Sequence, residues 1–412
     1  TSGIAGRLFE ALGFEEIEVV MIAQSAAQNS ISAVVDDAKA AQALRAIHEA
    51  FDREREVVRL AVVGATGGVG RALVRMIEEG AERLAERADL RFRLVALASS
   101  SRMVFDPKGL TSDVLAHLEE GEPTDLEALA ARLAEMPQRR VVFVDCTAAE
   151  AAADVYPTLL AEGVAVVTPN KRANTREMAF YRRLQALGTE TPFFYETTVG
   201  AALPVLATLR DLVRSGDRVR RIEGVLSGTL AFVFSEMRAG HPFSEAVREA
   251  RRRGFTEPDP RDDLEGRDVA RKLLTLAREA GFEAEMDEVA VASLVPAHLH
   301  EVPLAEFLAR LDEVDHIWAQ RMAALPEGHR LAYVGTVEPD ETGHVRLSVG
   351  VREIGPRHPM SILEGTDSLI AFTTDRYERP LVVFGPGAGP DLTASGVLAD
   401  VVHAALRMGE RL

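Results

Sequence analysis

VVRLAVVGATGGVGRALVRMI, residues 57–77, decides how the central part of this chain folds. An apolar run rich in valine comes first, a glycine turn follows, and a pattern of helical period completes the stretch. Gly64, Gly67 and Gly70 keep the turn tight, so backbone N–H groups at the helix start can approach a pyrophosphate. Strand, turn and helix in this order predict a dinucleotide-binding unit rather than a plain structural turn.

The chemistry around this turn favours a particular cofactor. The glycine spacing is GxxGxxG, one residue longer than GxGxxG, so the individual hydrogen bonds to phosphate stay open. The next strand-like run ends in LVALASSSRMVF, residues 94–105, without the acid that holds the ribose of NAD. Arg102 could pair with a 2′-phosphate, which favours NADP and leaves NAD possible; an exposed arginine without a ligand is the alternative. The contacts expected within the turn are Gly64, Thr66, Gly67, Gly68, Val69 and Gly70.

Composition excludes several classes of protein. The 412 residues suffice for two or three domains, and 47% hydrophobic with 27% charged residues is ordinary for a globular protein. A net charge of −17 disfavours nucleic acid or an anionic membrane as a partner. Cys146, the only cysteine, excludes intramolecular disulfides and cysteine-cluster metal sites. Without a signal-peptide pattern or an apolar run of roughly 18 residues, we expect a cytoplasmic protein that does not span a membrane.

The first region, residues 1–52, alternates helical and strand-like runs: IAGRLFEALG, IEVVMIA, SISAVV and DAKAAQALRAIHEAF. The charged DRERE at 52–56 reads as a linker. Residues 57–203 then alternate strand and helix, which predicts parallel βαβ units, a doubly wound sheet and the α/β class.

The second half of the chain has a different character. Residues 204–377 contain longer helices and runs that we interpret as amphipathic strands, RIEGVLSGTLAFVF at 221–234 and HVRLSVGVREI at 344–354. This predicts an α+β domain. Residues 378–412 return to strand, glycine turn and helix, and we expect them to complete the nucleotide-binding domain.

One stretch, GFTEPDPRDDLEGRDVARK at 254–272, holds six carboxylates and four basic side chains. A solvated loop is the usual reading of such a charge run. Asp268 and Lys272, however, lie four residues apart at the start of a helical pattern and therefore on one side of it. An ordinary salt bridge would explain the pair, but acids converging on a lysine could also bind a small zwitterion and move a proton.

Several longer motifs occur in the order found in homoserine dehydrogenases, a family that the chain resembles over essentially residues 57–412. These motifs are DCTA, VVTPNKRANT, YETTVGAALPVLATL, EGVLSGTLAFVFSEM, GFTEPDPRDDLEGRDVARKLLTLARE, EGTDSLIAFTTDRY and GPGAGPDLTASGV. The first fifty residues look like the end of the ACT regulatory region of an aspartokinase. Together they resemble the C-terminal half of a bifunctional aspartokinase–homoserine dehydrogenase, and the kinase's own phosphate motif is absent.

This resemblance implies reversible hydride transfer between L-homoserine and L-aspartate 4-semialdehyde, in threonine, methionine and isoleucine biosynthesis. It implies that Lys272 is the acid/base, oriented by Asp268 and with a pKa lowered by burial, and that Lys171 lies where cofactor and substrate meet. The implied substrate contacts are Glu257, Asp263, Gly228 and Thr229. Without the resemblance, Gly228 and Thr229 would be interpreted as a turn at the end of a strand. Further cofactor contacts are implied at Thr147, Lys171 and Gly387.

The resemblance also implies other ligands and partners. Glu196 and the carbonyls of Val199, Ala201 and Leu203 match a site for a monovalent cation such as sodium, a hard ion that prefers oxygen. Gln24 and Asn29 match the position where ACT domains bind an effector, here threonine. We expect a homodimer or larger homo-oligomer, in the cytoplasm or, in a plant, the plastid.

Two other functions compete with this interpretation. A cysteine-dependent semialdehyde dehydrogenase would need Cys146 as nucleophile, and an amino-acid-sensing module could carry a silent dehydrogenase. Phe255 stands where the family commonly has tyrosine, which predicts one missing hydroxyl contact to substrate. His48, His241 and His358 lack paired metal-ligand spacing, and we interpret them as structural.

Overall fold

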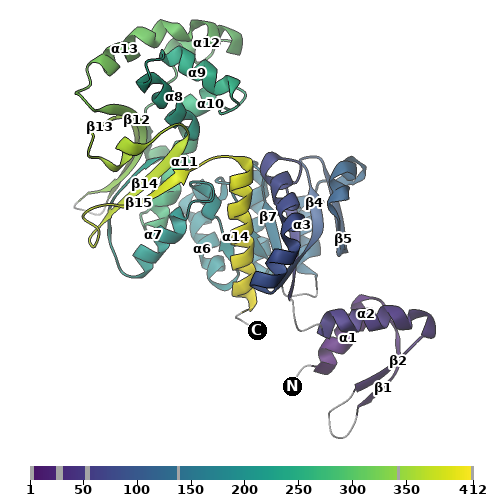
Figure 1. Cartoon of the computed structure of the whole chain (residues 1–412). Helices are drawn as coiled ribbons and strands as arrows, with labels where there is room; N and C mark the ends of the chain where they lie inside the picture. The colour runs from purple at the N-terminus through teal and green to yellow at the C-terminus, as the bar shows by residue number, and fades with distance from the viewer. Residues whose placement is uncertain (1–3, 25–30, 52–55, 137–139, 341–343, 410–412) are drawn as a thin grey trace. The chain divides into compact units, whose positions relative to one another are not determined.

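The computed structural model describes residues 4–24, 31–51, 56–136, 140–340 and 344–409 (Figure 1). The chain divides into two compact units. One comprises Thr1–Val57 with Ala81–Arg91, and the other comprises Val58–Gly80 with Phe92–Leu412.

The N-terminal segment forms two helices and a two-stranded antiparallel sheet, as its sequence pattern predicts. Its elements are α1 (Ile4–Phe14), β1 (Val19–Gln24), β2 (Ile31–Val35) and α2 (Ala40–Phe51). Apolar residues of both helices, including Leu8, Leu12 and Ala43, pack together with Ile17 as a small core. Gln24 ends β1, while Asn29 lies outside the described residues, as does the predicted linker except for Glu56, which already belongs to β3.

A seven-stranded sheet in the order β6-β5-β4-β3-β7-β8-β9 forms the centre of the second unit. The pairs β3–β7, β7–β8 and β8–β9 are parallel, and β5 runs antiparallel to its neighbours. The strands are β3 (Glu56–Val63), β4 (Leu90–Ala98), β5 (Arg102–Leu110), β6 (Glu122–Pro123), β7 (Val141–Asp145), β8 (Ala165–Val167) and β9 (Phe193–Phe194). Because β7 and β8 are buried along their whole length, they read as continuous apolar runs, the usual pattern of a covered parallel sheet.

Helices cover this sheet. They are α3 (Gly68–Ala88), α4 (Leu126–Ala134), α5 (Tyr156–Ala161), α6 (Met178–Glu190) and α14 (Pro390–Gly409). Helix α7 (Val205–Arg214) instead packs against α11 (Arg267–Glu279). The C-terminal helix α14 packs on β7, β8 and β9 and lies beside α3 in Figure 1. This arrangement confirms the predicted α/β class with a doubly wound nucleotide-binding sheet.

A six-stranded sheet of order β11-β13-β12-β10-β14-β15 builds the remaining part of this unit. Its strands are β10 (Val219–Val225), β11 (Val289–Val291), β12 (Arg330–Pro339), β13 (Val345–Ile354), β14 (Asp367–Thr374) and β15 (Leu381–Pro386). The helices here are α8 (Gly228–Arg238), α9 (Phe243–Arg252), α10 (Arg261–Leu264), α11 (Arg267–Glu279), α12 (Leu304–Arg310) and α13 (Asp315–Ala323). None of the helices within the described ranges is long and apolar enough to cross a membrane.

Two expectations about this half need correction. The strand predicted for 221–234 ends at Val225, and the rest of that run forms α8, whose first turn is capped by the Ser227 hydroxyl accepting from Leu230 N at 3.2 Å. In the tail, β15 pairs with β14 in the second sheet, so the chain returns to the nucleotide-binding sheet only after Pro386.

Candidate active site

A chain of ion pairs joins the two sheets of the larger unit. Lys171, which follows β8, lies 3.3 Å from Oδ1 of Asp268, and the Nζ of Lys272 lies 2.8 Å from Oδ2 of the same carboxylate. Lys272 also donates to the carbonyl of Leu226 at 2.7 Å, just beyond β10. Asp268 therefore bridges two lysines predicted to act together, although they are about a hundred residues apart in sequence.

Helix α11 places two of these side chains. Its Val269, Leu273 and Leu276 are buried, so Asp268 and Lys272, four residues apart, share another side of the helix. Gly266 precedes the helix with φ of 72°, and a Cβ there would lie 2.1 Å from the Tyr333 hydroxyl. Glycine is thus required at this helix start both for its backbone conformation and for space.

The two lysines determine the charge state of Asp268. Burial alone would raise the pKa of its carboxyl, but the ammonium groups of Lys272 and Lys171 outweigh burial and hold the pKa below its ordinary value. The Asp268 side chain nevertheless keeps 47% of its surface exposed. The site accordingly has an ionised carboxylate between two ammonium donors, next to open space.

The acids of the preceding loop form a second group. Asp263 accepts from the backbone N of Glu257 at 2.8 Å and lies 3.0 Å from the hydroxyl of Thr229, which in turn lies 2.5 Å from the carbonyl of Phe255. Burial raises the pKa of Asp263 to about 6, and the charges of Glu257 and Asp268 add to this effect. The Thr229 hydroxyl has one hydrogen and lies within donating distance of both the Phe255 carbonyl and Oδ1 of Asp263. Hydrogen bonds from Thr229 and from Glu257 N lower the pKa of Asp263, but burial outweighs them.

Buried polar groups that the sequence interpretation missed support the Lys171 loop. The carboxylate of Asp145, at the end of β7, accepts from Thr147 N, Tyr156 Oη and Asn170 Nδ2 at 2.7, 2.5 and 2.9 Å. Burial outweighs these hydrogen bonds and raises the pKa of Asp145. Asn170 also donates to Ala149 O at 2.8 Å, so one network fixes the loops after both β7 and β8.

Arg278, near the end of α11, provides another support. Its side chain is fully buried, and its Nη1 donates to the carbonyls of Asn174 and Arg176 at 2.8 and 2.7 Å. The helix that carries Asp268 and Lys272 is therefore tied directly to the loop that carries Lys171. A single arginine within an apolar helical pattern gave no signal of this role.

The glycine turn has the close packing expected of a nucleotide loop. A Cβ on Gly70 would lie 2.2 Å from the Gly64 carbonyl, and one on Gly64 would lie 3.0 Å from Cγ2 of Thr147. Helix α3 begins at Gly68 within the predicted contact set, so its first N–H groups lack intrahelical partners, as anion-binding helix starts do. These features fit a dinucleotide.

The loop of Gly387 lies beside both parts of the site. Pro390 would be 3.3 Å from a Cβ on Gly68, and Ala388 would be 3.4 Å from one on Gly228. Gly387 itself has no room for a side chain, because its Cβ would fall 2.0 Å from the Ser368 hydroxyl. The segment 387–390 thus connects the nucleotide turn with the substrate half.

Arg102 begins β5, directly after the end of β4. Its Nη1 donates to the Gly121 carbonyl at 3.3 Å, and its backbone N donates to Ser99 Oγ at 3.0 Å. A guanidinium has five N–H donors, so one bond leaves the group able to contact an anion.

Glu196 has a role that the sequence did not reveal. Its carboxylate accepts from the backbone N of Leu206 at 2.6 Å and of Ala207 at 2.8 Å, so it caps the start of α7. Ala201 has a φ of 53°, so the backbone turns at this residue. The Leu203 carbonyl already accepts from Val205 N at 2.8 Å. A carboxylate and a carbonyl each have further lone pairs, so the oxygens of Glu196 and Leu203 keep the capacity to bind a hard cation.

Other singled-out residues have structural surroundings. Burial and the charge of Asp145 raise the pKa of Cys146, which disfavours the thiolate that a nucleophile needs. His241 and His358 lie 3.7 and 3.5 Å from Glu236 and Glu223. The side chain of His48 lies outside what the structure describes, and the described residues contain no cluster of three or more His, Cys, Asp or Glu that could hold a metal ion.

Comparison with known proteins gives matches along most of the chain. Residues 204–402 match the family model for homoserine dehydrogenase, residues 66–193 its NAD binding domain, and residues 1–51 the ACT domain. The chain is 38% identical to a homoserine dehydrogenase of Emericella nidulans over 381 residues, covering 99% of that protein and 85% of this chain.

Two further proteins extend the comparison. A bifunctional aspartokinase/homoserine dehydrogenase of Haemophilus influenzae is 41% identical over 97% of this chain, which spans 49% of that relative's length. A hyperthermophilic archaeal homoserine dehydrogenase in complex with NADPH has the same fold, with a TM-score of 0.63, 23% identity and coverage of 85% of this chain and 98% of that one.

Proposed function

We propose residue roles and a cofactor preference for this chain, which belongs to the homoserine dehydrogenase family and is an NAD(P)-dependent oxidoreductase. The reaction is reversible hydride transfer between L-homoserine and L-aspartate 4-semialdehyde. The single observation that carries the proposed roles is the Asp268 carboxylate held between Lys171 and Lys272 at 3.3 and 2.8 Å.

In this proposal, a nicotinamide cofactor supplies the hydride acceptor or donor, and the chain's own groups manage the proton. When homoserine is oxidised, its hydroxyl must lose a proton as hydride leaves the carbon; in the reverse direction, the aldehyde oxygen gains one. Lys272 is the acid/base, and Asp268 with the Leu226 carbonyl fixes the direction of its Nζ. Lys171 shares Asp268 and neutralises charge where cofactor and substrate meet.

Glu257 and Asp263 bind the substrate's ammonium group. Glu257 lies on the loop before α10 and Asp263 lies within α10, and the Asp263 carboxylate accepts from Glu257 N at 2.8 Å. The backbone of Gly228 and the hydroxyl of Thr229, at the start of α8, complete the substrate contacts. Glu257→Gln should raise the homoserine KM and leave kcat nearly unchanged, because it weakens the grip on the ammonium without changing proton transfer.

NADP is the preferred cofactor, since Arg102 can pair with a 2′-phosphate and one hydrogen bond to Gly121 leaves most of its donors available. Initial rates with NADP and NAD test this preference. Arg102→Ala should raise the NADP KM and leave the NAD KM unchanged. A clear preference of the wild type for NAD would overturn the assignment.

The experiment that tests the reaction is NADPH formation from L-homoserine by the purified chain. Appearance of NADPH without added phosphate supports hydride transfer to an alcohol–aldehyde pair. NADPH formation from L-aspartate 4-semialdehyde that requires phosphate would instead indicate chemistry at Cys146. No NADPH under any of these conditions would indicate a sensing module with a silent dehydrogenase.

The remaining ligands and partners complete the proposal. A monovalent cation such as sodium binds the oxygens of Glu196, Val199, Ala201 and Leu203 in a structural role. The chain works as a homodimer or larger homo-oligomer in the cytoplasm or a plastid. Threonine is the effector of the ACT region, with Gln24 and Asn29 as its contacts, and it acts weakly or not at all on this chain.

A further inference from the structure

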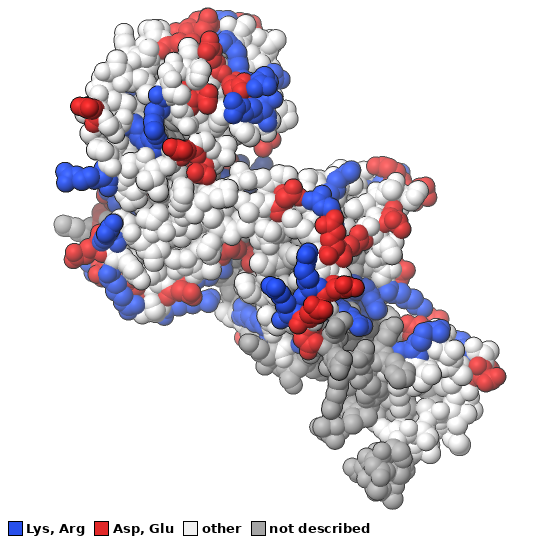
Figure 2. All heavy atoms as spheres, viewed as in Figure 1, with Lys and Arg blue, Asp and Glu red and all other residues white. Residues whose placement is uncertain are grey.

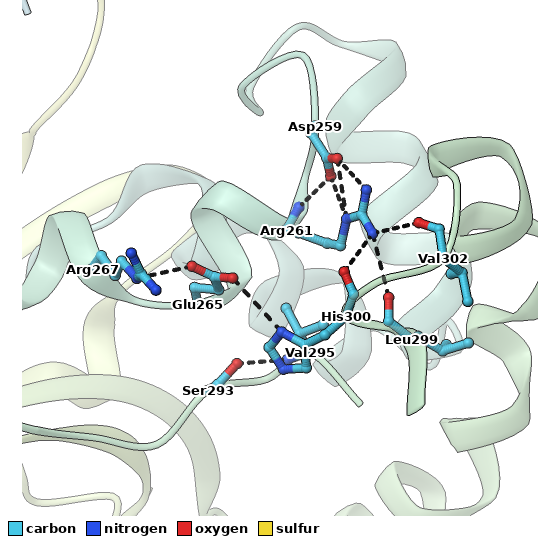
Figure 3. Close-up of polar contacts among 9 residues, drawn as sticks. All are labelled: Asp259, Arg261, Glu265, Arg267, Ser293, Val295, Leu299, His300 and Val302. Atoms are coloured by element: carbon cyan, nitrogen blue, oxygen red, sulfur yellow. Dashed lines mark hydrogen bonds and ion pairs between the residues drawn. The ribbon is translucent and has the colours of Figure 1, made fainter. Parts of the chain in front are cut away.

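Arg261 lies at the start of α10, between the preceding loop, which carries Glu257 and Asp259, and the segment 299–302 (Figure 3). Its guanidinium contacts both carboxylate oxygens of Asp259, with Nη2 to Oδ2 at 2.6 Å and Nε to Oδ1 at 3.0 Å. Its Nη1 donates to the carbonyls of Val302 at 2.7 Å and His300 at 2.9 Å. Only 16% of this side chain is exposed.

The planar guanidinium of Arg261 makes contacts along two of its edges. One edge of the guanidinium binds the Asp259 carboxylate. The same carboxylate also accepts from the backbone N of Arg261 at 3.0 Å, so Asp259 holds the turn into α10 through both the side chain and the backbone of Arg261. The other edge reaches backbone carbonyls about forty residues later in the chain. A lysine ammonium could not reproduce this geometry, because its donors do not lie in one plane.

What Arg261 fixes is the base of the loop that carries the substrate acids. Asp263 lies two residues further on, within α10, and its carboxylate holds the backbone of Glu257 at 2.8 Å. Pro258 and Pro260 restrict the chain between Glu257 and Arg261. Because the intervening backbone is stiff, a displacement of Arg261 would be passed to both acids.

We propose that Arg261 is a positioning residue for substrate binding: it anchors the acids Glu257 and Asp263 to the segment 299–302. The inference rests on the proposed function, since it assumes that these acids bind the substrate ammonium. Preorganising the loop removes an ordering cost that substrate binding would otherwise carry, so the anchor acts on affinity for homoserine and not on NADP.

The same stretch offers a matched control. Arg267, six residues later, also forms an ion pair, with Glu265 at 3.0 Å, and Glu265 in turn lies 3.7 Å from His300 (Figure 3). The Arg267 side chain is 70% exposed, so its pair is expected to contribute little. Arg267→Gln therefore removes a neighbouring arginine and an ion pair without removing the anchor.

The test compares Arg261→Gln, Arg261→Lys and Arg267→Gln with the wild type by steady-state kinetics and by hydrogen exchange of peptides covering residues 254–266. Arg261→Gln should raise the homoserine KM on the order of tenfold, with the NADP KM and kcat within about twofold of wild type. Exchange of the Glu257 amide should become faster. Arg261→Lys should recover part of the affinity, and Arg267→Gln should behave as the wild type.

Several outcomes separate this inference from the function it rests on. An unchanged homoserine KM in a folded Arg261→Gln variant overturns it, and so does an equal loss for homoserine and NADP, which would mark a general structural role. If Arg261→Gln does not fold, Asp259→Asn removes one arm of the anchor and must raise the same KM. A wild type that does not oxidise homoserine refutes the proposed function, while hydrogen exchange still reports whether Arg261 orders the loop.

Discussion

Lys272 is the side chain whose removal tests the proton-transfer proposal most directly. Replacing it with alanine should lower kcat by roughly 10²–10⁴, the usual contribution of a positioned acid or base. Steady-state rates in both directions measure this, and Lys108→Ala, an exposed lysine of β5, serves as the control. Near-native turnover of the Lys272 variant would move the role to Lys171 or to water.

Asp263 should make substrate affinity depend on pH. Burial raises the pKa of this carboxyl to about 6, so its negative charge is present above that pH and is lost as the pH falls through it. The homoserine KM should therefore rise as the pH falls through about 6, with little change in the NADP KM. Asp263→Asn should have a high homoserine KM that no longer follows this titration; a variant that keeps the wild-type profile would refute the assignment.

The raised pKa of Asp263 also affects the stability of the fold. Stability should fall as the pH rises, whereas substrate affinity should increase. A folded-state pKa above the ordinary 3.8 means that the folded protein binds this proton more tightly than the unfolded chain. The stabilising contribution of the protonated group is complete below pH 3.8 and is lost as the pH rises through about 6. Above that pH, the buried charge costs stability, as is common for groups kept for substrate binding.

Local spacing explains which site residues the sequence could predict. Asp268 and Lys272 lie four apart on one helix, so their pairing follows from helical geometry alone. Lys171 could be added only through the family resemblance. Asp145 and Arg278 gave no signal, because their partners are backbone groups or side chains that only the tertiary fold brings together.

Helix α7 shows a capping residue that does not come directly before its helix. Glu196 lies nine residues before Val205, yet its carboxylate accepts from two N–H groups of the first turn. Glu196→Ala should lower the melting temperature and destabilise the fold by about 1–2 kcal/mol, because those N–H groups lose their acceptor and the helix start loses a negative charge.

The conservative variant Glu196→Gln separates the hydrogen bonds from the charge. It keeps one acceptor oxygen and should lose less stability than the alanine variant in the same melting experiment. Asp400 provides a second readout: burial and then the Glu196 charge raise the pKa of Asp400 to about 7, so that pKa should fall in Glu196→Gln. An alanine variant as stable as the wild type would show that the cap is dispensable.

Helix α8 illustrates where pattern alone fails. The stretch from Ile222 to Phe234 is mostly apolar or glycine, and short apolar runs do not distinguish a buried strand from a buried helix. Ser227, followed by Gly228, was the available signal, since serine is a favoured N-cap and its hydroxyl accepts from Leu230 N. Strand β3 was predictable because a glycine turn ends its apolar run, and β8 because Pro169 and Asn170 follow it after one residue.

The chain spans 49% of the length of a bifunctional relative, and its residues 1–51 match the ACT domain. Among its described residues, this segment has the helices α1 and α2 and one sheet of two strands, β1 and β2. A two-stranded sheet is marginal by itself, and its edges leave backbone groups unpaired. Val20, Met21 and Ile22 of β1 are 70, 58 and 53% exposed, so this sheet also presents uncovered apolar surface.

We therefore expect the chain to oxidise homoserine and to respond weakly or not at all to threonine, because a two-stranded sheet with an exposed apolar face encloses little space for an effector. Titrating the NADPH-forming activity with threonine measures this, with Gln24→Ala as the paired variant. A flat titration in both proteins agrees with the expectation. Strong, saturable inhibition of the wild type that disappears in Gln24→Ala would mean that two strands suffice for a working threonine sensor, and that the effector site lies at the end of β1.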